Sequence, residues 1–142
     1  MMRKLIVFIL GGLALGLAAC SSALPTKAGP QEITVEVSEF KFQPATIEVA
    51  AGSPVKITMR NQSAVEHDWN IMKIPAAGIK SLSQSAMEHD MGGANQPELH
   101  MSAMMGQIAQ MEFTPTRPGT YEFYCAVVGH KESGMVGTLV VK

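Results

Sequence analysis

The residues best suited to chemistry lie close together near the carboxyl end of the chain. Cys125, His130 and Met135 bring a thiol, an imidazole and a thioether into eleven residues, between two runs that are typical of strands. Two imidazoles, one thiolate and a weak, distant thioether form the ligand set of copper sites that transfer single electrons. His67, in the segment Glu66–Trp69, is the candidate for the second imidazole. These residue types indicate one copper ion held by the four side chains.

The spacing of these residues allows one loop to surround a single ion. Four residues separate Cys125 from His130, and four separate His130 from Met135. Cys125 ends one predicted strand and Met135 begins the next, so three ligands come from the turn between the two strands. His67 must then come from a neighbouring strand, which ties the loop to the rest of the fold.

The ligand types also select the metal and the reaction. Thiolate and imidazole bind both Cu(I) and Cu(II), whereas the thioether favours Cu(I), so a compromise geometry serves both oxidation states. The set leaves no coordination position open for a substrate, which favours electron transfer over catalysis. Zinc accepts Cys and His ligands, but Met is a poor zinc ligand. We therefore expect one type 1 copper ion, alternating between Cu(I) and Cu(II), and no enzymatic activity.

The first twenty residues are typical of an export signal. Arg3 and Lys4 precede an uncharged apolar run over residues 5–19, which is too short for a comfortable bilayer span. The run ends in Leu17-Ala18-Ala19-Cys20, which resembles a bacterial lipobox. The resemblance implies a signal peptide over 1–19 and lipid on the Cys20 sulfur, hence an exported, membrane-anchored lipoprotein facing the periplasm or the cell exterior. The alternatives are a plain secretory signal and an uncleaved anchor helix.

The remaining chain, from Cys20 to Lys142, suits one domain over 31–142 preceded by a tether over 20–30. Without Arg3 and Lys4 it carries 9 Lys and Arg (11 − 2) against 12 Asp and Glu, a formal charge of −3. This mild acidity argues against nucleic-acid binding, which requires a concentrated basic surface. If Cys20 carries lipid, Cys125 has no disulfide partner, and a lone thiol in an oxidising compartment is a liability unless a metal occupies it.

Apolar and polar residues alternate along most of the domain, with Gly and Pro at the turns between the alternating runs. Such alternation predicts half-buried strands. Six or seven short strands with few helical stretches favour an all-β fold, an antiparallel sandwich. The predicted strands lie at about 33–37, 47–49, 55–59, 67–74, 107–113, 120–125 and 136–141.

Residues 76–106 interrupt this pattern. The segment has about thirty residues, where connections between strands usually have fewer than a dozen. Met residues at helical spacing usually pack in a core. Alternatively, the thioethers form an adaptable apolar docking surface for a redox partner, or they bind additional Cu(I) together with two His residues. The Met and His residues of this excursion are Met87, His89, Met91, His100, Met101, Met104 and Met105.

Three motifs resemble those of the cupredoxin family, in particular its plastocyanin/azurin-like and auracyanin-like members. They are Phe42-x-Pro44-x-x-Ile47-x-Val49-x-x-Gly52, the His67 segment, and Tyr124-Cys125-x4-His130-x4-Met135-x-Gly137-x-Leu139-x-Val141. The resemblance covers about 33–141, without the Met-rich excursion. It implies a Greek-key β-sandwich with a type 1 blue copper site at one end. It also implies that the ring edge of His130 meets solvent and passes on the electron.

Three positions near the ligands depart from the family pattern. Asp68 follows the first His, where members often have Asn, and Ala126 follows the Cys, where Ser or Thr is frequent; those residues brace the two loops. Val128 stands where Pro is common. We expect Asp68 to orient His67 or the loop as an outer group around the metal. The alternative is a solvated charge at the surface.

Three functions compete for this ligand set. The leading hypothesis is a monomeric, membrane-tethered electron shuttle whose redox partner is a cytochrome, an oxidase or a photosynthetic complex. The alternative is a periplasmic copper chaperone or Cu(I) reservoir, with the Met-rich segment as its working part. Multicopper oxidases and copper nitrite reductases need additional His clusters, and this chain has four His and no His-x-His pair.

Overall fold

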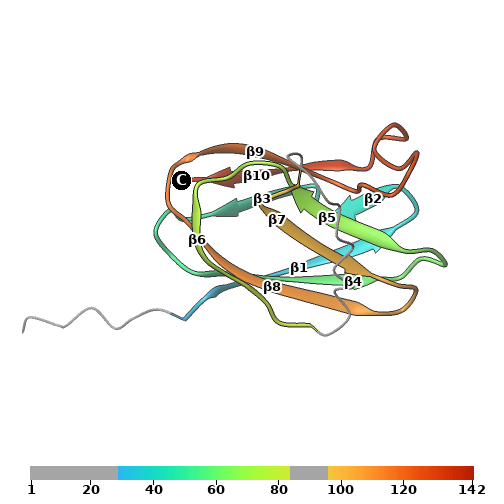
Figure 1. The fold of residues 1–142 in the computed structure, drawn as a ribbon, viewed down its shortest axis with the longest axis horizontal. Helices are drawn as coiled ribbons and strands as arrows, with labels where there is room; N and C mark the ends of the chain where they lie inside the picture. The colour runs from blue at the N-terminus through green and yellow to red at the C-terminus, as the bar shows by residue number, and fades with distance from the viewer. Residues whose placement is uncertain (1–28, 84–95) are drawn as a thin grey trace, which may run out of the picture.

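The computed structural model describes residues 29–83 and 96–142, which form two packed β-sheets (Figure 1). This part of the chain contains no helix that is long and apolar enough to cross a bilayer. The predicted signal peptide, Cys20 and most of the predicted tether lie outside the described residues. The ten strands are β1 (Gln31–Ser38), β2 (Lys41–Gln43), β3 (Thr46–Val49), β4 (Val55–Asn61), β5 (His67–Ile71), β6 (Ala76–Ser81), β7 (Leu99–Ala103), β8 (Ile108–Pro115), β9 (Gly119–Tyr124) and β10 (Val136–Val141).

Each sheet has five strands. The order is β2-β1-β4-β8-β6 in the first sheet and β3-β10-β9-β5-β7 in the second. This arrangement confirms the all-β sandwich. The expectation of a purely antiparallel sandwich is wrong, because β1 pairs in parallel with β4, and β3 in parallel with β10. The chain crosses to the second sheet through β3 before it returns as β4, so β4 runs in the same direction as β1.

The alternating residues that predicted strands point into the space between the sheets. Val35 and Val37 of β1 are fully buried, as are Ile57 and Met59 of β4. The fully buried Trp69 of β5 connects the two layers. Its ring lies 6.5 Å from that of Phe113 in β8 and 5.4 Å from that of Phe123 in β9, measured between ring centroids. The apolar area removed from water by this core is the main stabilising contribution to the fold.

The predicted irregular excursion over residues 76–106 is wrong for two of its parts. Ala76–Ser81 forms β6, which pairs with β8, and Leu99–Ala103 forms β7, which pairs with β5. The period-two pattern that marks a strand is weak in β6, because five of its six residues are exposed. Residues 84–95, which include Met87, His89 and Met91, lie outside the described part of the chain.

Four connections meet at one end of the sandwich, opposite the carboxyl terminus (Figure 1). They are the β1–β2 turn, the β4–β5 loop over 62–66, the β7–β8 loop over 104–107 and the β9–β10 loop over 125–135. Residues far apart in the sequence are therefore gathered on one small surface, and His67 and Cys125 lie at its base.

Candidate metal centre

His67, Cys125 and His130 form one cluster at this end of the sandwich. Their candidate ligand atoms all lie within 4.8 Å of one another. His67 is the first residue of β5, Cys125 directly follows β9, and His130 lies in the β9–β10 loop. His67 and Cys125 are fully buried, whereas His130 is partly exposed. The structure thus brings together the three side chains that the sequence selected.

The separations within the cluster match those around a single ion. The Cys125 sulfur lies 3.8 Å from His67 Nδ1 and 3.4 Å from His130 Nδ1, and the two Nδ1 atoms are 3.2 Å apart. With metal bonds of about 2.0 Å to nitrogen and about 2.3 Å to sulfur, three ligand atoms spread by about 120° lie about 3.5 Å (N to N) and about 3.7 Å (N to S) apart. The three residues therefore fit a trigonal site for a copper ion.

Met135 is the last residue of the β9–β10 loop, directly before β10. It is fully buried, and its backbone carbonyl accepts a hydrogen bond of 3.2 Å from the Cys125 amide. Its own amide donates to the His130 carbonyl at 3.0 Å. The backbone of Met135 thus lies beside those of two members of the cluster.

The loop that carries these residues is held by its own hydrogen bonds. The His130 amide donates to the Val127 carbonyl at 3.0 Å, and the Ser133 hydroxyl donates to the Gly129 carbonyl at 2.7 Å. Gly129 and Gly134 have φ of 82° and 92°, a left-handed conformation that a side chain at either position would oppose. This bonding fixes the loop without the Pro that is common in the family at position 128.

Asp68 contacts the cluster through its backbone. The Asp68 amide donates to the Cys125 sulfur at 3.3 Å, so β5 positions the sulfur as well as His67. Hydrogen bonds to a thiolate stabilise its charge and tune the potential of such a copper site. Ala126 is partly buried beside Cys125, and its methyl side chain offers no hydrogen bond that links the loops.

Asn61 and Ser63, which lie just after the predicted strand over 55–59, supply the hydrogen bonds that brace two loops. The side-chain nitrogen of Asn61, Nδ2, donates to the carbonyls of Val65 and Ala103, at 2.7 and 2.8 Å. The Asn61 side-chain oxygen accepts from the amide and the hydroxyl of Ser63, both at 2.9 Å. Ala103 lies opposite His67 in the sheet, so this network holds the loop that leads into the ligand. The signal was an Asn-x-Ser that begins at the last residue of β4, a pattern that favours turns closed by a side chain.

Burial shifts the pKa values of His67 and Cys125 in the metal-free cluster. Desolvation is the main cause that lowers the pKa of His67 below its ordinary 6.5, and the nearby charge of His130 lowers it further. The charge of Glu39 has a smaller, opposing effect. Desolvation raises the pKa of Cys125, although hydrogen bonds from the Asp68 and Val127 amides oppose this. His67 is therefore held neutral, the form that binds a metal, whereas Cys125 must release a proton when copper binds.

The remaining candidates from the Met-rich segment lie in different surroundings. Met101 is fully buried in the core, which agrees with the core-packing interpretation for this residue. His100 precedes Met101 in β7, so its side chain lies on the other face of the sheet. The Nδ1 atom of His100 lies 2.6 Å from the Asn70 side-chain oxygen. Met104 and Met105 are exposed, in the β7–β8 loop at the same end of the sandwich as the metal cluster.

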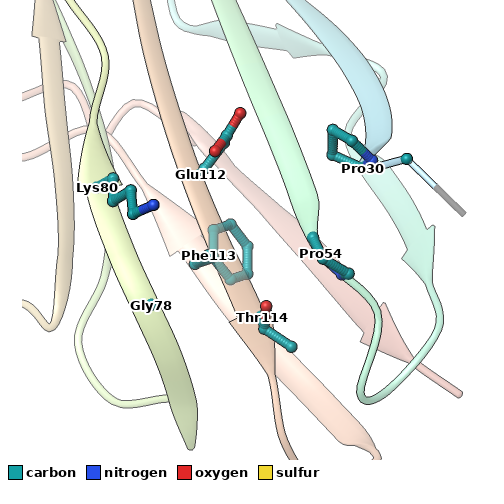
Figure 2. A pocket seen from close by; sticks show the side chains of 8 residues that line it. Pro30, Pro54, Gly78, Lys80, Glu112, Phe113 and Thr114 are labelled. Atoms are coloured by element: carbon teal, nitrogen blue, oxygen red, sulfur yellow. The ribbon is translucent and has the colours of Figure 1, made fainter. Parts of the chain in front are cut away.

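A separate hollow lies on the first sheet, along β6 and β8 (Figure 2). Lys80 and Glu112, which face each other across these strands, line it together with Pro30 and Pro54. The residues described there include no Cys or His. This hollow therefore lacks the ligands of a second copper site.

Residues 7–141 match the model of a family described as cupredoxin-like domain. The chain belongs to the cupredoxin family. This cupredoxin is 31% identical over 121 residues to the copper-resistant cuproprotein CopI of Rubrivivax gelatinosus, covering 83% of this chain and 72% of the relative. It is 27% identical over 159 residues to auracyanin-A of Chloroflexus aurantiacus, covering 99% and 97%.

Further similarities agree with this membership. The cupredoxin is 31% identical over 113 residues to plastocyanin of Dryopteris crassirhizoma, covering 78% of this chain and 97% of the relative. Among solved structures, auracyanin B superposes with a TM-score of 0.60 at 22% identity, covering 85% of this chain and 95% of that chain, and so supports the fold. Together with the cluster of His67, Cys125, His130 and Met135, these findings identify a type 1 blue copper protein that binds one copper ion.

The expectation that this cupredoxin is not an enzyme is confirmed by the same relatives. Auracyanin-A and plastocyanin are blue copper proteins, and the chain covers nearly their full length. A multicopper oxidase from Campylobacter jejuni also shares the fold, with a TM-score of 0.57 at 13% identity, but the chain covers only 32% of it. That similarity extends to the sandwich alone.

Proposed function

We propose that His67, Cys125, His130 and Met135 are the four ligands of the copper ion, and that the protein carries single electrons. The observation that supports this most strongly is the triangle of His67 Nδ1, Cys125 Sγ and His130 Nδ1, with sides of 3.2 to 3.8 Å. Copper, when bound, supplies the couple between Cu(II) and Cu(I). The protein holds the ligands in one geometry for both oxidation states.

The surroundings of the cluster suit this role. The loop from Cys125 to Met135 is fixed by backbone hydrogen bonds, and His67 extends from a strand that is buried along its whole length. Rigid ligand positions keep rearrangement small when the charge on the ion changes. Because His130 is the partly exposed member of the cluster, its ring is the route by which an electron enters or leaves.

We further propose that the protein works outside the cytoplasm, attached to a membrane through lipid on Cys20. The first twenty residues, with their basic start, apolar run and lipobox, support this location. The partner is a larger redox protein, such as a cytochrome, an oxidase or a photosynthetic complex, and the protein itself is a monomer.

Electron exchange with a cytochrome tests this function. The oxidised, copper-loaded protein is mixed with a reduced c-type cytochrome, and both absorption spectra are followed by stopped flow. The expected result is oxidation of one cytochrome per protein chain. Protein loaded with zinc, which has no redox chemistry, is the control. Absence of electron exchange, with release of copper to an apo-acceptor instead, would contradict the proposal.

The similarity to the copper-resistant cuproprotein CopI favours a second candidate, a copper chaperone or reservoir. Met104 and Met105 are exposed at the copper end and offer thioethers that suit Cu(I). The additional Cu(I) ligands of this candidate would be these two residues with Met87, His89, Met91 and His100, whereas Met101 is buried in the core and is not one of them. A Cu(I) titration against a competing chelator tests it. More than one bound equivalent, reduced by Met104→Leu with Met105→Leu, supports a reservoir, whereas strictly one equivalent rules it out.

A further inference from the structure

Phe40 occupies an unfavourable backbone position beside the metal cluster. Ser38 pairs with Lys41, so Glu39 and Phe40 form a two-residue turn between β1 and β2. Phe40 has a φ of 55°. A positive φ at the second turn residue favours Gly or Asn, and a bulky side chain is rare there because its Cβ crowds the backbone. The turn therefore carries a conformational cost that Gly would avoid.

Burial in the core does not offset this cost. The Phe40 side chain remains 43% exposed. Phe42, two residues later in β2, is buried, and its ring packs against Phe123 with 5.2 Å between centroids. Phe42 thus anchors the hairpin to the sandwich, and the fold has no need of an aromatic ring at position 40.

The Phe40 ring instead contacts His130. The two ring centroids are 5.1 Å apart and the ring planes are nearly perpendicular, at 89°, which is the favoured edge-to-face geometry. The Nδ1 atom of His130 is directed towards the Cys125 sulfur and His67 Nδ1. The His130 imidazole is therefore held between the cluster on one side and a ring from a separate hairpin on the other.

We propose that Phe40 is a positioning residue that keeps the His130 imidazole oriented towards copper and limits its rotation out of the site. The inference rests on the proposed role of His130 as a ligand. The His130 loop contains Gly129 and Gly134 in left-handed conformations, so a contact from outside the loop adds a constraint on the ring. An edge-to-face aromatic pair changes an equilibrium constant by about two- to tenfold, and copper release requires His130 to leave the metal.

Phe40→Gly separates the role of the ring from that of the fold. Gly suits the turn, so the free energy of unfolding of the metal-free variant, measured in urea, is expected to equal or exceed that of the wild type. Copper release from the reduced variant to a chelator is nevertheless expected to be about two- to tenfold faster. Phe40→Tyr keeps the ring and is expected to retain the wild-type release rate. Val128→Ala, in the same loop as His130 and 97% exposed, is the control for a lost apolar side chain and is expected to change nothing.

A second measurement tests the contact without copper. In the NMR spectrum of the metal-free protein, the His130 ring protons are expected to shift in Phe40→Gly but not in Phe40→Tyr. Equal release rates in wild type and Phe40→Gly, or unchanged His130 resonances, would overturn the proposal. Failure of the proposed electron-carrier function appears in the wild type itself, as absence of electron exchange, and is therefore distinct from failure of the Phe40 proposal.

Discussion

The side chain of Asn61 offers the sharpest test of how the loops are positioned. Asn61 is 3% exposed, and its side chain makes four hydrogen bonds of 2.7 to 2.9 Å. Each contributes about 1 kcal/mol net, and a buried group that loses its partner costs at least as much. The Val65 carbonyl keeps its bond from the Ser63 hydroxyl at 3.0 Å. Asn61→Ala should therefore lower the free energy of unfolding by about 3 kcal/mol.

Urea denaturation of the metal-free protein measures this change. Gln62→Ala is the matched control, because the Gln62 side chain makes one exposed hydrogen bond, to Glu36. The control should remain within about 0.5 kcal/mol of the wild type. Because the network holds the loop before His67, Asn61→Ala should also weaken copper binding about tenfold or more, as loss of an outer partner of a metal site does. If Asn61→Ala behaved like Gln62→Ala in both measurements, the bracing role would be refuted.

Three further predictions concern pH, packing and the axial ligand. The pKa of His67 is lowered in the fold, so the unfolded chain binds a proton first as pH falls below about 6.5. The free energy of unfolding of the metal-free protein, measured in urea, should therefore decrease below this pH. A free energy of unfolding that does not change with pH there would contradict the proposed desolvation of His67. The pKa of Cys125 is raised, so stability should fall again as pH rises above about 9, where the unfolded thiol ionises first. Cys125→Ala should remove this loss and leave only the one that begins above about 10, where Tyr124, whose pKa burial also raises, ionises in the unfolded chain. At Gly137, an added Cβ would collide with the Phe123 ring, so Gly137→Ala should lower the free energy of unfolding by about 1–3 kcal/mol in the same assay. A Gly137→Ala variant as stable as the wild type would show that the packing around Phe123 is looser than described. Met135→Gln replaces a soft thioether by a harder oxygen donor that prefers Cu(II). If the affinity for Cu(II) relative to Cu(I) rises by ten- to a hundredfold, the reduction potential measured in a redox titration should fall by about 60–120 mV, at 59 mV for each tenfold change. An unchanged potential would remove Met135 from the ligand set.

Much of the metal centre could be predicted because its information is local. Cys125, His130 and Met135 lie within one loop, and the spacing alone shows that they can surround an ion. The alternation in β1 and β4 similarly predicted the strands, since every second side chain of β4 is buried, as are Val35 and Val37 in β1. His67 was harder to assign, and its selection depended on the competing histidines, His89 and His100, both lying in the Met-rich excursion.

The features that escaped prediction depend on contacts between distant segments. β6 has little apolar alternation because five of its residues are exposed, and it is a strand only by pairing with β8. β7 was hidden in a Met-rich run, although three of its five residues are fully buried in the core. Asn61 acts across 42 positions on Ala103, and Phe40 acts across the two hairpins on His130. No pattern within either segment reveals its distant partner.

The absorption spectrum of the copper-loaded protein tests the central proposition most directly, namely that Cys125 and the two histidines bind one ion. The oxidised wild type is expected to show intense visible absorption that disappears on reduction, with one copper per chain. Cys125→Ser should abolish this absorption while the fold is retained. Strong absorption that persists in Cys125→Ser, or an oxidised wild-type holoprotein without colour, would contradict the assignment.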